Sequence, residues 1–271
     1  MASLSVTTDI VQIKHALVAI HGAEACSYLN VLRDRIGPLK ETSHQDGDFL
    51  DGSLTVDLDI SRTEQGLVLV WNKVGEKPLK FHLDFIKVAN QLRSFPAPKQ
   101  GAFNQALGKK TKSVIDATGG WGGDALLMFL QGYEVTIIER LPIMASLLSD
   151  AFDRLSKSLL NSPKVGENTL HAPKVLCGNA LSVLRDNRLP ADCVYLDPMF
   201  PPKRKKSAAT NKQMQLLQWL AGPDSDASEL ATYAHAHYPR VTVKRPDYAH
   251  PLLTKPSVQF SSKLVHYDVY L

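Results

Sequence analysis

From Ser113 to Leu271 the sequence repeats one pattern: a short apolar run, a turn, and a longer stretch with helical spacing of its apolar residues. The apolar runs predict strands at 113–116, 134–139, 174–177, 193–197 and 241–244, and the stretches between them predict helices at 124–131, 143–160, 214–220 and 228–237. Strands that alternate with helices form a parallel sheet through right-handed crossovers. The tail, 258–260 and 265–271, predicts a hairpin that adds an antiparallel edge. We therefore expect an α/β fold with a doubly wound, mostly parallel, Rossmann-like sheet.

The first hundred residues have a different pattern of apolar and polar residues. Residues 10–21 and 26–36 have helical spacing, whereas 54–60 and 67–71 alternate apolar and polar residues on either side of a glycine-containing turn. A further short strand is expected at 79–85. The sequence Phe95-Pro96-Ala97-Pro98 then interrupts the pattern. We expect a smaller mixed α/β N-terminal region, residues 1–100, that contacts the substrate, followed by the main domain, residues 101–271.

Composition narrows the class of protein. Of the 271 residues, 44% are hydrophobic and 21% are charged, which is ordinary for a soluble protein with a substantial core. No stretch approaches the roughly 20 apolar residues of a membrane span. Cys26, Cys177 and Cys193 are widely spaced and form no paired motif. They indicate reduced thiols in a cytoplasmic protein, and we expect neither a metal site nor a membrane association.

A glycine-rich turn follows the first strand of the main domain. It reads Asp116-Ala117-Thr118-Gly119-Gly120-Trp121-Gly122-Gly123-Asp124. Glycines at such a turn let the backbone fold tightly and let a ligand approach it closely. Glu139 ends the next strand, where an acid can hold ribose hydroxyls. The same turn also satisfies a dinucleotide fingerprint through Gly120, Gly122 and Ala125, so these features leave a nicotinamide-dependent enzyme open.

The end of the fourth strand carries the sequence Asp197-Pro198-Met199-Phe200-Pro201-Pro202. It resembles the Asp/Asn-Pro-Pro-aromatic motif of methyltransferases that modify exocyclic amino groups of nucleic-acid bases. An aryl amine is a poor nucleophile because its lone pair is delocalised into the ring. Asp197 and a backbone carbonyl beside Pro198 can accept its N–H bonds and raise the electron density on nitrogen. Phe200 offers a face on which a base can stack.

Taken together, the motifs resemble the small-subunit ribosomal RNA guanine-N2 methyltransferase J family. The resemblance rests on the glycine turn, Glu139-Arg140, 195–201 and the sequence Val243-Lys244-Arg245-Pro246-Asp247-Tyr248, and it covers roughly residues 101–271. It implies transfer of a methyl group from S-adenosylmethionine to one guanine N2 amine near the 3′ end of 16S ribosomal RNA, within the 30S subunit. Met199, where base methyltransferases often have a second proline, belongs to this family's own pattern.

The resemblance also implies the cofactor contacts. The family's contact positions fall on Gly123 with Asp124, Glu139 with Arg140, Asn179 with Ala180, and Asp197. Asp116, Gly120 and Gly122 join them through the glycine turn. The sequence departs from the family at Gly123, where an arginine is common, and at Asn179-Ala180, which replaces two serines. Contacts at these positions are therefore expected to involve the backbone.

Basic residues gather in stretches that contain no acid. Such local positive charge attracts phosphate backbones, so we expect RNA contacts there. The expected contacts are Lys109, Lys110, Lys203, Arg204, Lys205, Lys206, Lys244 and Arg245. We further expect these groups to lie around one mouth, at the carboxyl ends of the strands.

Several alternatives stay open at this level. Asp197-Pro198-Met199-Phe200 does not settle which amine is methylated, so an adenine-N6 or other base-amine methyltransferase acting on RNA or DNA is the nearest rival. A ribosome assembly factor that has kept the fold without catalysis is a rival from another class. A nicotinamide oxidoreductase lacks a convincing acid or base for hydride transfer. We expect a monomer.

Overall fold

The computed structural model describes residues 6–7, 19–21, 55–63, 65–73, 77–162, 172–200, 212–221 and 224–271. The chain divides into two compact units, Met1–Leu83 and Asp84–Leu271. The second unit begins before the boundary at Gly101 that the sequence suggested, because the segment preceding that glycine packs on the larger unit. In α2 (Phe85–Asn90), the ring of Phe85 lies 4.8 Å from the ring of Phe152, measured between centroids.

The first unit contains a five-stranded sheet. Its strands are β1 (Val6–Thr7), β2 (Ala19–His21), β3 (Thr55–Thr63), β4 (Gly66–Lys73) and β5 (Leu79–His82). The order is β1-β3-β4-β5, with β2 also paired to β3. The predicted hairpin is confirmed, with Thr63 opposite Gly66. The helix predicted at 10–21 is wrong at its end, because 19–21 pair in parallel with β3. Residues 10–18 and the helix predicted at 26–36 lie outside the described residues.

The second unit is built on a seven-stranded sheet of order β11-β12-β10-β9-β6-β7-β8. The strands are β6 (Ser113–Asp116), β7 (Glu134–Glu139), β8 (Lys174–Cys177), β9 (Cys193–Leu196), β10 (Val241–Pro246), β11 (Val258–Ser261) and β12 (Val265–Tyr270). From β8 to β10 all neighbours are parallel, and β12 runs antiparallel to β10 and β11. The predicted doubly wound sheet and its antiparallel edge are confirmed. The chain reverses its direction of travel between β6 and β9, which is where such sheets bind ligands.

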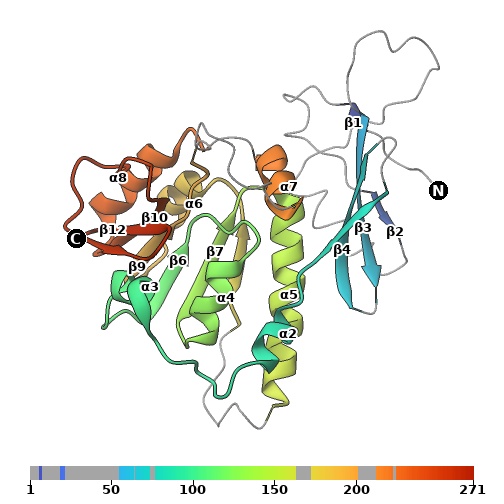
Figure 1. Ribbon diagram of the computed structural model, residues 1–271, viewed down its shortest axis with the longest axis horizontal. Helices are drawn as coiled ribbons and strands as arrows, with labels where there is room; N and C mark the ends of the chain where they lie inside the picture. The colour runs from blue at the N-terminus through green and yellow to red at the C-terminus, as the bar shows by residue number, and fades with distance from the viewer. Residues whose placement is uncertain are drawn as a thin grey trace. The chain divides into compact units, whose positions relative to one another are not determined.

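Helices cover both faces of this sheet (Figure 1). One face carries α3 (Gly101–Leu107), α4 (Gly123–Leu130) and α5 (Pro142–Leu160), and the other carries α6 (Ala180–Asn187) and α8 (Ala227–His237). A further helix, α7, spans Lys212–Ala221. The predicted helices correspond to α4, α5, α7 and α8, whereas α2, α3 and α6 were not predicted. None of the helices in the described part of the chain is both long and apolar enough to cross a membrane.

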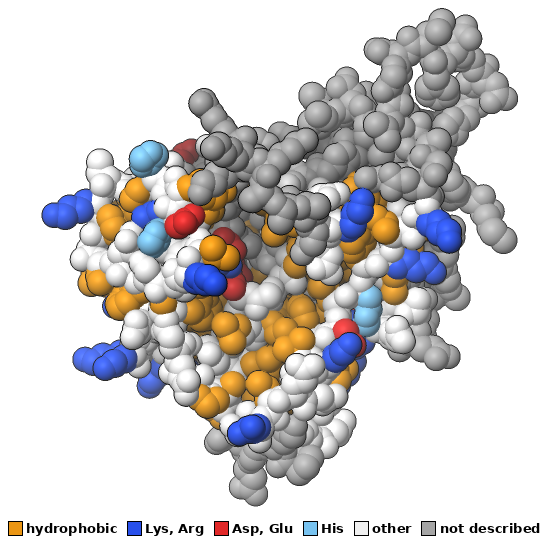
Figure 2. Space-filling view, viewed as in Figure 1, with side chains coloured by type: hydrophobic (Ala, Val, Ile, Leu, Met, Phe, Trp, Pro, Cys, Tyr) orange, Lys and Arg blue, Asp and Glu red, His pale blue; other side chains and the backbone are white. Residues whose placement is uncertain are grey.

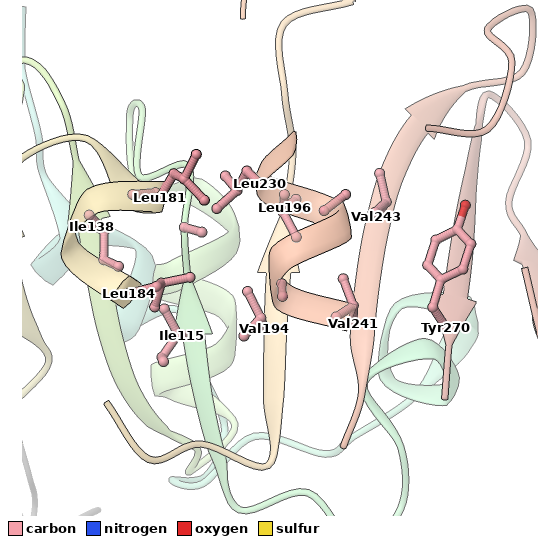
Figure 3. Packing of buried hydrophobic residues seen from close by; sticks show 14 residues of the cluster. Ile115, Ile138, Leu181, Leu184, Val194, Leu196, Leu230, Val241, Val243 and Tyr270 are labelled. Carbon is pink, nitrogen blue, oxygen red and sulfur yellow. The ribbon is translucent and has the colours of Figure 1, made fainter. Parts of the chain in front are cut away.

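The inner strands of the parallel part, such as β6 and β9, are buried on both faces, which explains their continuous apolar runs. All four residues of β9, from Cys193 to Leu196, are fully buried. Figure 3 shows Leu184 of α6 and Leu230 of α8 packed over the sheet residues, among them Ile115 and Val194. Burial of one such side chain stabilises the fold by about 1.5–3 kcal/mol. This core holds the carboxyl ends of β6, β7 and β9 in fixed positions beside one another.

Candidate active site

The glycine turn joins β6 to α4 and requires glycine at a defined point. Gly122 has φ +74°, and a Cβ on it would lie 2.4 Å from Cδ2 of Leu148. Gly120 has φ +52°, and its N–H donates to Oε2 of Glu139 at 2.7 Å. The turn and the acid at the end of β7, which were paired from the sequence, are therefore in direct contact.

Glu139 is 6% exposed, and both of its carboxylate oxygens are used. The second oxygen, Oε1, accepts the N–H of Leu141 at 2.7 Å. Burial raises the pKa of Glu139, and the two backbone N–H groups oppose that shift. The carboxylate therefore fixes the shape of the glycine turn in addition to facing the cavity beside it.

The loop after β9 is held by its backbone. The N–H of Asp197 donates to Oγ1 of Thr118 at 2.7 Å, and the N–H of Met199 donates to Oδ2 of Asp224 at 2.7 Å. Pro198 lies between them and has no N–H to donate. Every backbone donor from 197 to 199 is thus bonded to a side chain from another part of the unit.

A lysine joins two of the predicted site acids. Lys244 Nζ lies 2.7 Å from Oδ2 of Asp124 and 2.8 Å from Oδ2 of Asp197. The hydroxyl of Tyr195 also donates to Oδ2 of Asp124, at 2.7 Å. Burial raises the pKa of Asp197 to about 6, and the charge of Lys244 opposes this rise. Burial lowers the pKa of Lys244, but the attraction of Asp197 and Asp124 outweighs it, so the ammonium stays charged.

Asp116, at the end of β6, is 2% exposed. Its Oδ1 accepts the N–H of Thr118 at 3.0 Å. Burial, together with the nearby charges of Asp124, Asp197 and Glu139, raises the pKa of Asp116 to about 7. This concentration of carboxyl groups around one lysine creates a negative potential, which suits a ligand that carries positive charge.

A second network connects the ends of three strands. Arg140 Nη2 lies 3.1 Å from Asp224 Oδ1 and 3.0 Å from Asp226 Oδ1. The side-chain amide of Asn179 donates to Asp226 Oδ2 at 2.6 Å, and its oxygen caps α6 by accepting the N–H of Ser182. The segment before α8 therefore joins the residues that follow β7, β8 and β9.

Two adjoining cavities lie at this edge of the sheet. The β7–β8 cavity is lined by residues that include Glu139, Arg140, Gly178, Ala180 and Asp224. The β9–β10 cavity is lined by residues that include Trp121, Pro198, Phe200 and Lys244. The lining shared by both is Thr118, Gly120, Asp197, Met199 and Leu217.

The structure brings the predicted cofactor residues together at these cavities. Those that line one or both are Asp116, Gly120, Gly122, Gly123, Asp124, Glu139, Arg140, Ala180 and Asp197. Asn179 lines neither, because its side chain is bonded to Asp226 and to the start of α6. Pro198 and Phe200 of the predicted catalytic loop line the β9–β10 cavity beside Asp197.

The predicted RNA contacts are scattered. Lys109 and Lys110 precede β6, next to Lys112, whose N–H donates to Asp192 just before β9. They lie at the amino ends of the strands, so the expectation that they surround the same mouth is wrong. A four-residue strand separates them from the glycine turn by about 13 Å. Lys203, Arg204, Lys205 and Lys206 lie outside the described residues.

The last two basic positions differ from each other. Both residues line the β9–β10 cavity, but Arg245 is only 6% exposed and forms an ion pair with Asp268, which is fully buried. A second nitrogen of Arg245 donates to the carbonyl of Ala249 at 2.6 Å. Figure 2 shows Lys and Arg side chains at separate points of the viewed face and no continuous basic patch among the described residues.

Sequence reasoning missed three side chains that organise the site: Thr118, Asp224 and Asp226. Thr118 belongs to the glycine turn, but its bond to the N–H of Asp197 depends on β6 and β9 being neighbours. Asp224 and Asp226 precede α8, and in the sequence they resemble ordinary helix-capping residues. No local signal shows that they reach the residues after β7 and β8.

A seven-stranded sheet of this order, with a glycine turn bonded to the acid that ends the neighbouring strand, defines a Rossmann-like S-adenosylmethionine-dependent methyltransferase. The model of a family described as "Putative SAM-dependent methyltransferase" matches residues 53–271. The chain belongs to this family, together with relatives named ribosomal RNA small subunit methyltransferase J.

Two such relatives show how far the similarity extends. The protein from Hydrogenovibrio crunogenus is 40% identical over 196 residues, which cover 69% of this chain and 68% of the relative. The protein from Pseudoalteromonas translucida is 36% identical over 258 residues, which cover 92% of this chain and 94% of the relative. The crystal structure of a SAM-dependent methyltransferase from Neisseria gonorrhoeae is also similar, with a TM-score of 0.59 and 25% identity over 94% of this chain and 96% of that one.

Proposed function

We propose that this protein methylates the exocyclic N2 amine of a guanine near the 3′ end of 16S ribosomal RNA, in the small ribosomal subunit. The proposal rests on one observation above all: Asp197, Pro198 and Phe200 line a cavity together with the glycine turn. The names of the relatives support ribosomal RNA as the substrate. The choice of guanine N2 rests on the family resemblance of the motifs.

S-adenosylmethionine supplies an electrophilic methyl group on its sulfonium, and the residues present suit it. The negative potential of Asp116, Asp124 and Asp197 favours binding of the positively charged sulfonium. We assign the ribose hydroxyls to Glu139, whose carboxylate is already oriented by two backbone N–H groups. We assign the remaining contacts to Gly120, Gly122, Gly123, Arg140, Asn179 and Ala180, with backbone groups serving at Gly123 and Asn179.

The chain activates the amine through two acceptors. Asp197 has a pKa of about 6, so its carboxylate is ionised at neutral pH and accepts one N–H of the amine. The carbonyl of Pro198 accepts the other, so the nitrogen lone pair is directed at the methyl donor. As the new N–C bond forms, the methyl–sulfur bond breaks with its electron pair left on sulfur, the amine loses one proton, and Asp197 is placed to receive that proton. Phe200 stacks against the base.

RNA is held by basic residues in this proposal. Lys203, Arg204, Lys205 and Lys206 follow the catalytic loop in sequence and are assigned to the phosphate backbone near the target base. Lys109 and Lys110 are assigned to a more distant part of the RNA, since they lie at the amino ends of the strands. The N-terminal region, residues 1–100, contributes further substrate contacts. We propose a cytoplasmic monomer.

The test uses radiolabelled S-adenosylmethionine and 30S subunits from a strain that lacks this modification. Label is expected in N2-methylguanosine within the 3′ part of 16S RNA for the wild type, and Asp197→Ala is expected to abolish it. Glu229→Ala is the matched control, since it removes only an exposed ion pair with Arg185. Label on an adenine or another base amine would replace the guanine assignment. Intact cofactor binding without label on 30S subunits would overturn ribosomal RNA as the substrate.

A further inference from the structure

We infer that Asp224 is a positioning residue for methyl transfer: it aims the carbonyl of Pro198 by holding the N–H of Met199. The inference rests on the proposed role of that carbonyl as an acceptor for the base amine. Asp224 lies before α8, in a different part of the chain from the catalytic loop, and lines the β7–β8 cavity.

Peptide geometry links the two groups. The peptide bond between Pro198 and Met199 is a rigid plane, in which a trans arrangement makes the carbonyl and the N–H point in opposite directions. Oδ2 of Asp224 accepts the Met199 N–H at 2.7 Å. The Pro198 carbonyl therefore points away from Asp224. A charged acceptor makes a stronger bond to an N–H group than a neutral one does, so this plane is held firmly.

Asp224 is itself held in place. Its other oxygen, Oδ1, lies 3.1 Å from Nη2 of Arg140, the residue that directly follows Glu139. Arg140 is also paired with Asp226. One carboxylate thus connects the strand end that faces the cofactor to the loop that faces the base. Misplacement of reacting groups by as little as about 1 Å is costly in catalysis, which gives such a connection a direct effect on rate.

The role of Asp224 depends on the identity of residue 199. A proline at this position, as in many base methyltransferases, would have no N–H for Asp224 to hold. Here position 199 has an anchored N–H in place of a proline ring, so a side chain sets the orientation that a proline at this position would otherwise restrict. The opposite end of the loop is fixed in the same way, through the bond from the Asp197 N–H to Thr118.

The experiment compares Asp224→Ala, Asp224→Asn and Asp226→Ala with the wild type, on 30S subunits at saturating cofactor. Asp224→Ala is expected to lower kcat about 10- to 100-fold, because the Pro198 carbonyl is no longer fixed. Asp224→Asn keeps an oxygen that can accept the Met199 N–H and is expected to recover most of kcat. Asp226→Ala takes a carboxylate from Arg140 without touching Met199, so it is expected to raise the cofactor Kd more than it lowers kcat.

Equal kcat for Asp224→Ala and the wild type would overturn the inference. So would equal losses for Asp224→Asn and Asp224→Ala, since charge at Arg140 would then be the cause, or a kcat loss in Asp226→Ala as large as that in Asp224→Ala. Thermal unfolding and cofactor Kd of each variant identify a folding defect. Wild-type label in N2-methylguanosine is scored separately, so failure of the guanine assignment is distinguishable from failure of the positioning role.

Discussion

The ammonium of Lys244 lies 2.8 Å from Oδ2 of Asp197, so the proposed acceptor of the base amine carries its own counter-ion. Two strands meet through this pair, because Lys244 is on β10 and Asp197 follows β9, its parallel neighbour. The lysine favours the ionised form of a carboxylate whose pKa burial raises to about 6. Lys244 therefore sets the pH range in which the carboxylate of Asp197 is ionised and can accept the N–H of the amine.

Replacing this lysine should move the acid limb of the pH–rate profile. In the wild type kcat/KM is expected to fall as the pH drops through about 6, where Asp197 becomes protonated. Lys244→Met removes the charge that lowers the pKa of Asp197, so the limb should move upward by about one pH unit or more, equivalent to about 1.4 kcal/mol. Lys244→Arg keeps the charge and should retain a limb near the wild-type position. An unmoved limb in Lys244→Met would show that Asp197 does not titrate in the reaction.

Asp116 should make stability depend on pH. Its folded pKa of about 7 lies above the value of 3.8 expected for an unfolded chain, so between these limits the folded state binds more protons. The contribution of Asp116 therefore weakens stability as the pH rises from about 4 to about 7, with a slope of at most about 1.4 kcal/mol per pH unit. Asp116→Asn should remove this slope, since the amide oxygen can still accept from Thr118. Urea unfolding across this pH range measures the slope of the unfolding free energy against pH. If the slope persists in the variant, other groups are its cause.

Two adjacent glycines should respond differently to alanine. Gly122→Ala places a Cβ 2.4 Å from Leu148 at a positive φ, so we expect a loss of about 2 kcal/mol or more and weaker cofactor binding. Gly123→Ala meets no atom within 4 Å and should change stability by less than about 0.5 kcal/mol. Urea denaturation and cofactor titration compare the two variants. Similar behaviour of both would contradict the tight turn at Gly122.

Arg245 is expected to stabilise the fold through its ion pair with Asp268. Arg245→Met leaves the fully buried carboxylate of Asp268 without its cation, and we expect a loss of about 3–5 kcal/mol in the free energy of unfolding. Lys109→Met, at an exposed position, should stay within about 0.5 kcal/mol. If the Arg245 variant kept wild-type stability and lost only RNA affinity, the contact with RNA expected from the sequence would regain support.

The order of strands and helices from Ser113 onward could be predicted because each element carries its own periodicity. The contact between the glycine turn and Glu139 also followed, since parallel neighbours bring their carboxyl ends together. Short elements escaped prediction: α3 has seven residues and α6 has eight, too few for a clear helical period. The edge on which Lys109 and Lys110 lie was mistaken because their closeness in sequence to the glycine turn was given more weight than the length of the strand predicted between them.

Side-chain contacts made by the segment before α8 and by β12 could not be predicted. The bond from Met199 to Asp224 and the pairing of Arg140 with Asp226 depend on where the segment before α8 lies, which no local pattern encodes. The burial of Arg245 likewise depends on β12 supplying Asp268 to the neighbouring strand. A lysine and an arginine that are adjacent in sequence thus have different partners, although both line the β9–β10 cavity.

The insertion of β12 between β10 and β11 has a consequence for folding during synthesis. Domains generally begin to fold from their N-terminal side while translation continues. Here β10 emerges from the ribosome well before 265–270, so until those residues are translated it has an open edge and Arg245 has no Asp268 beside it. The half of the sheet that carries Lys244 is therefore completed only when β12 is added.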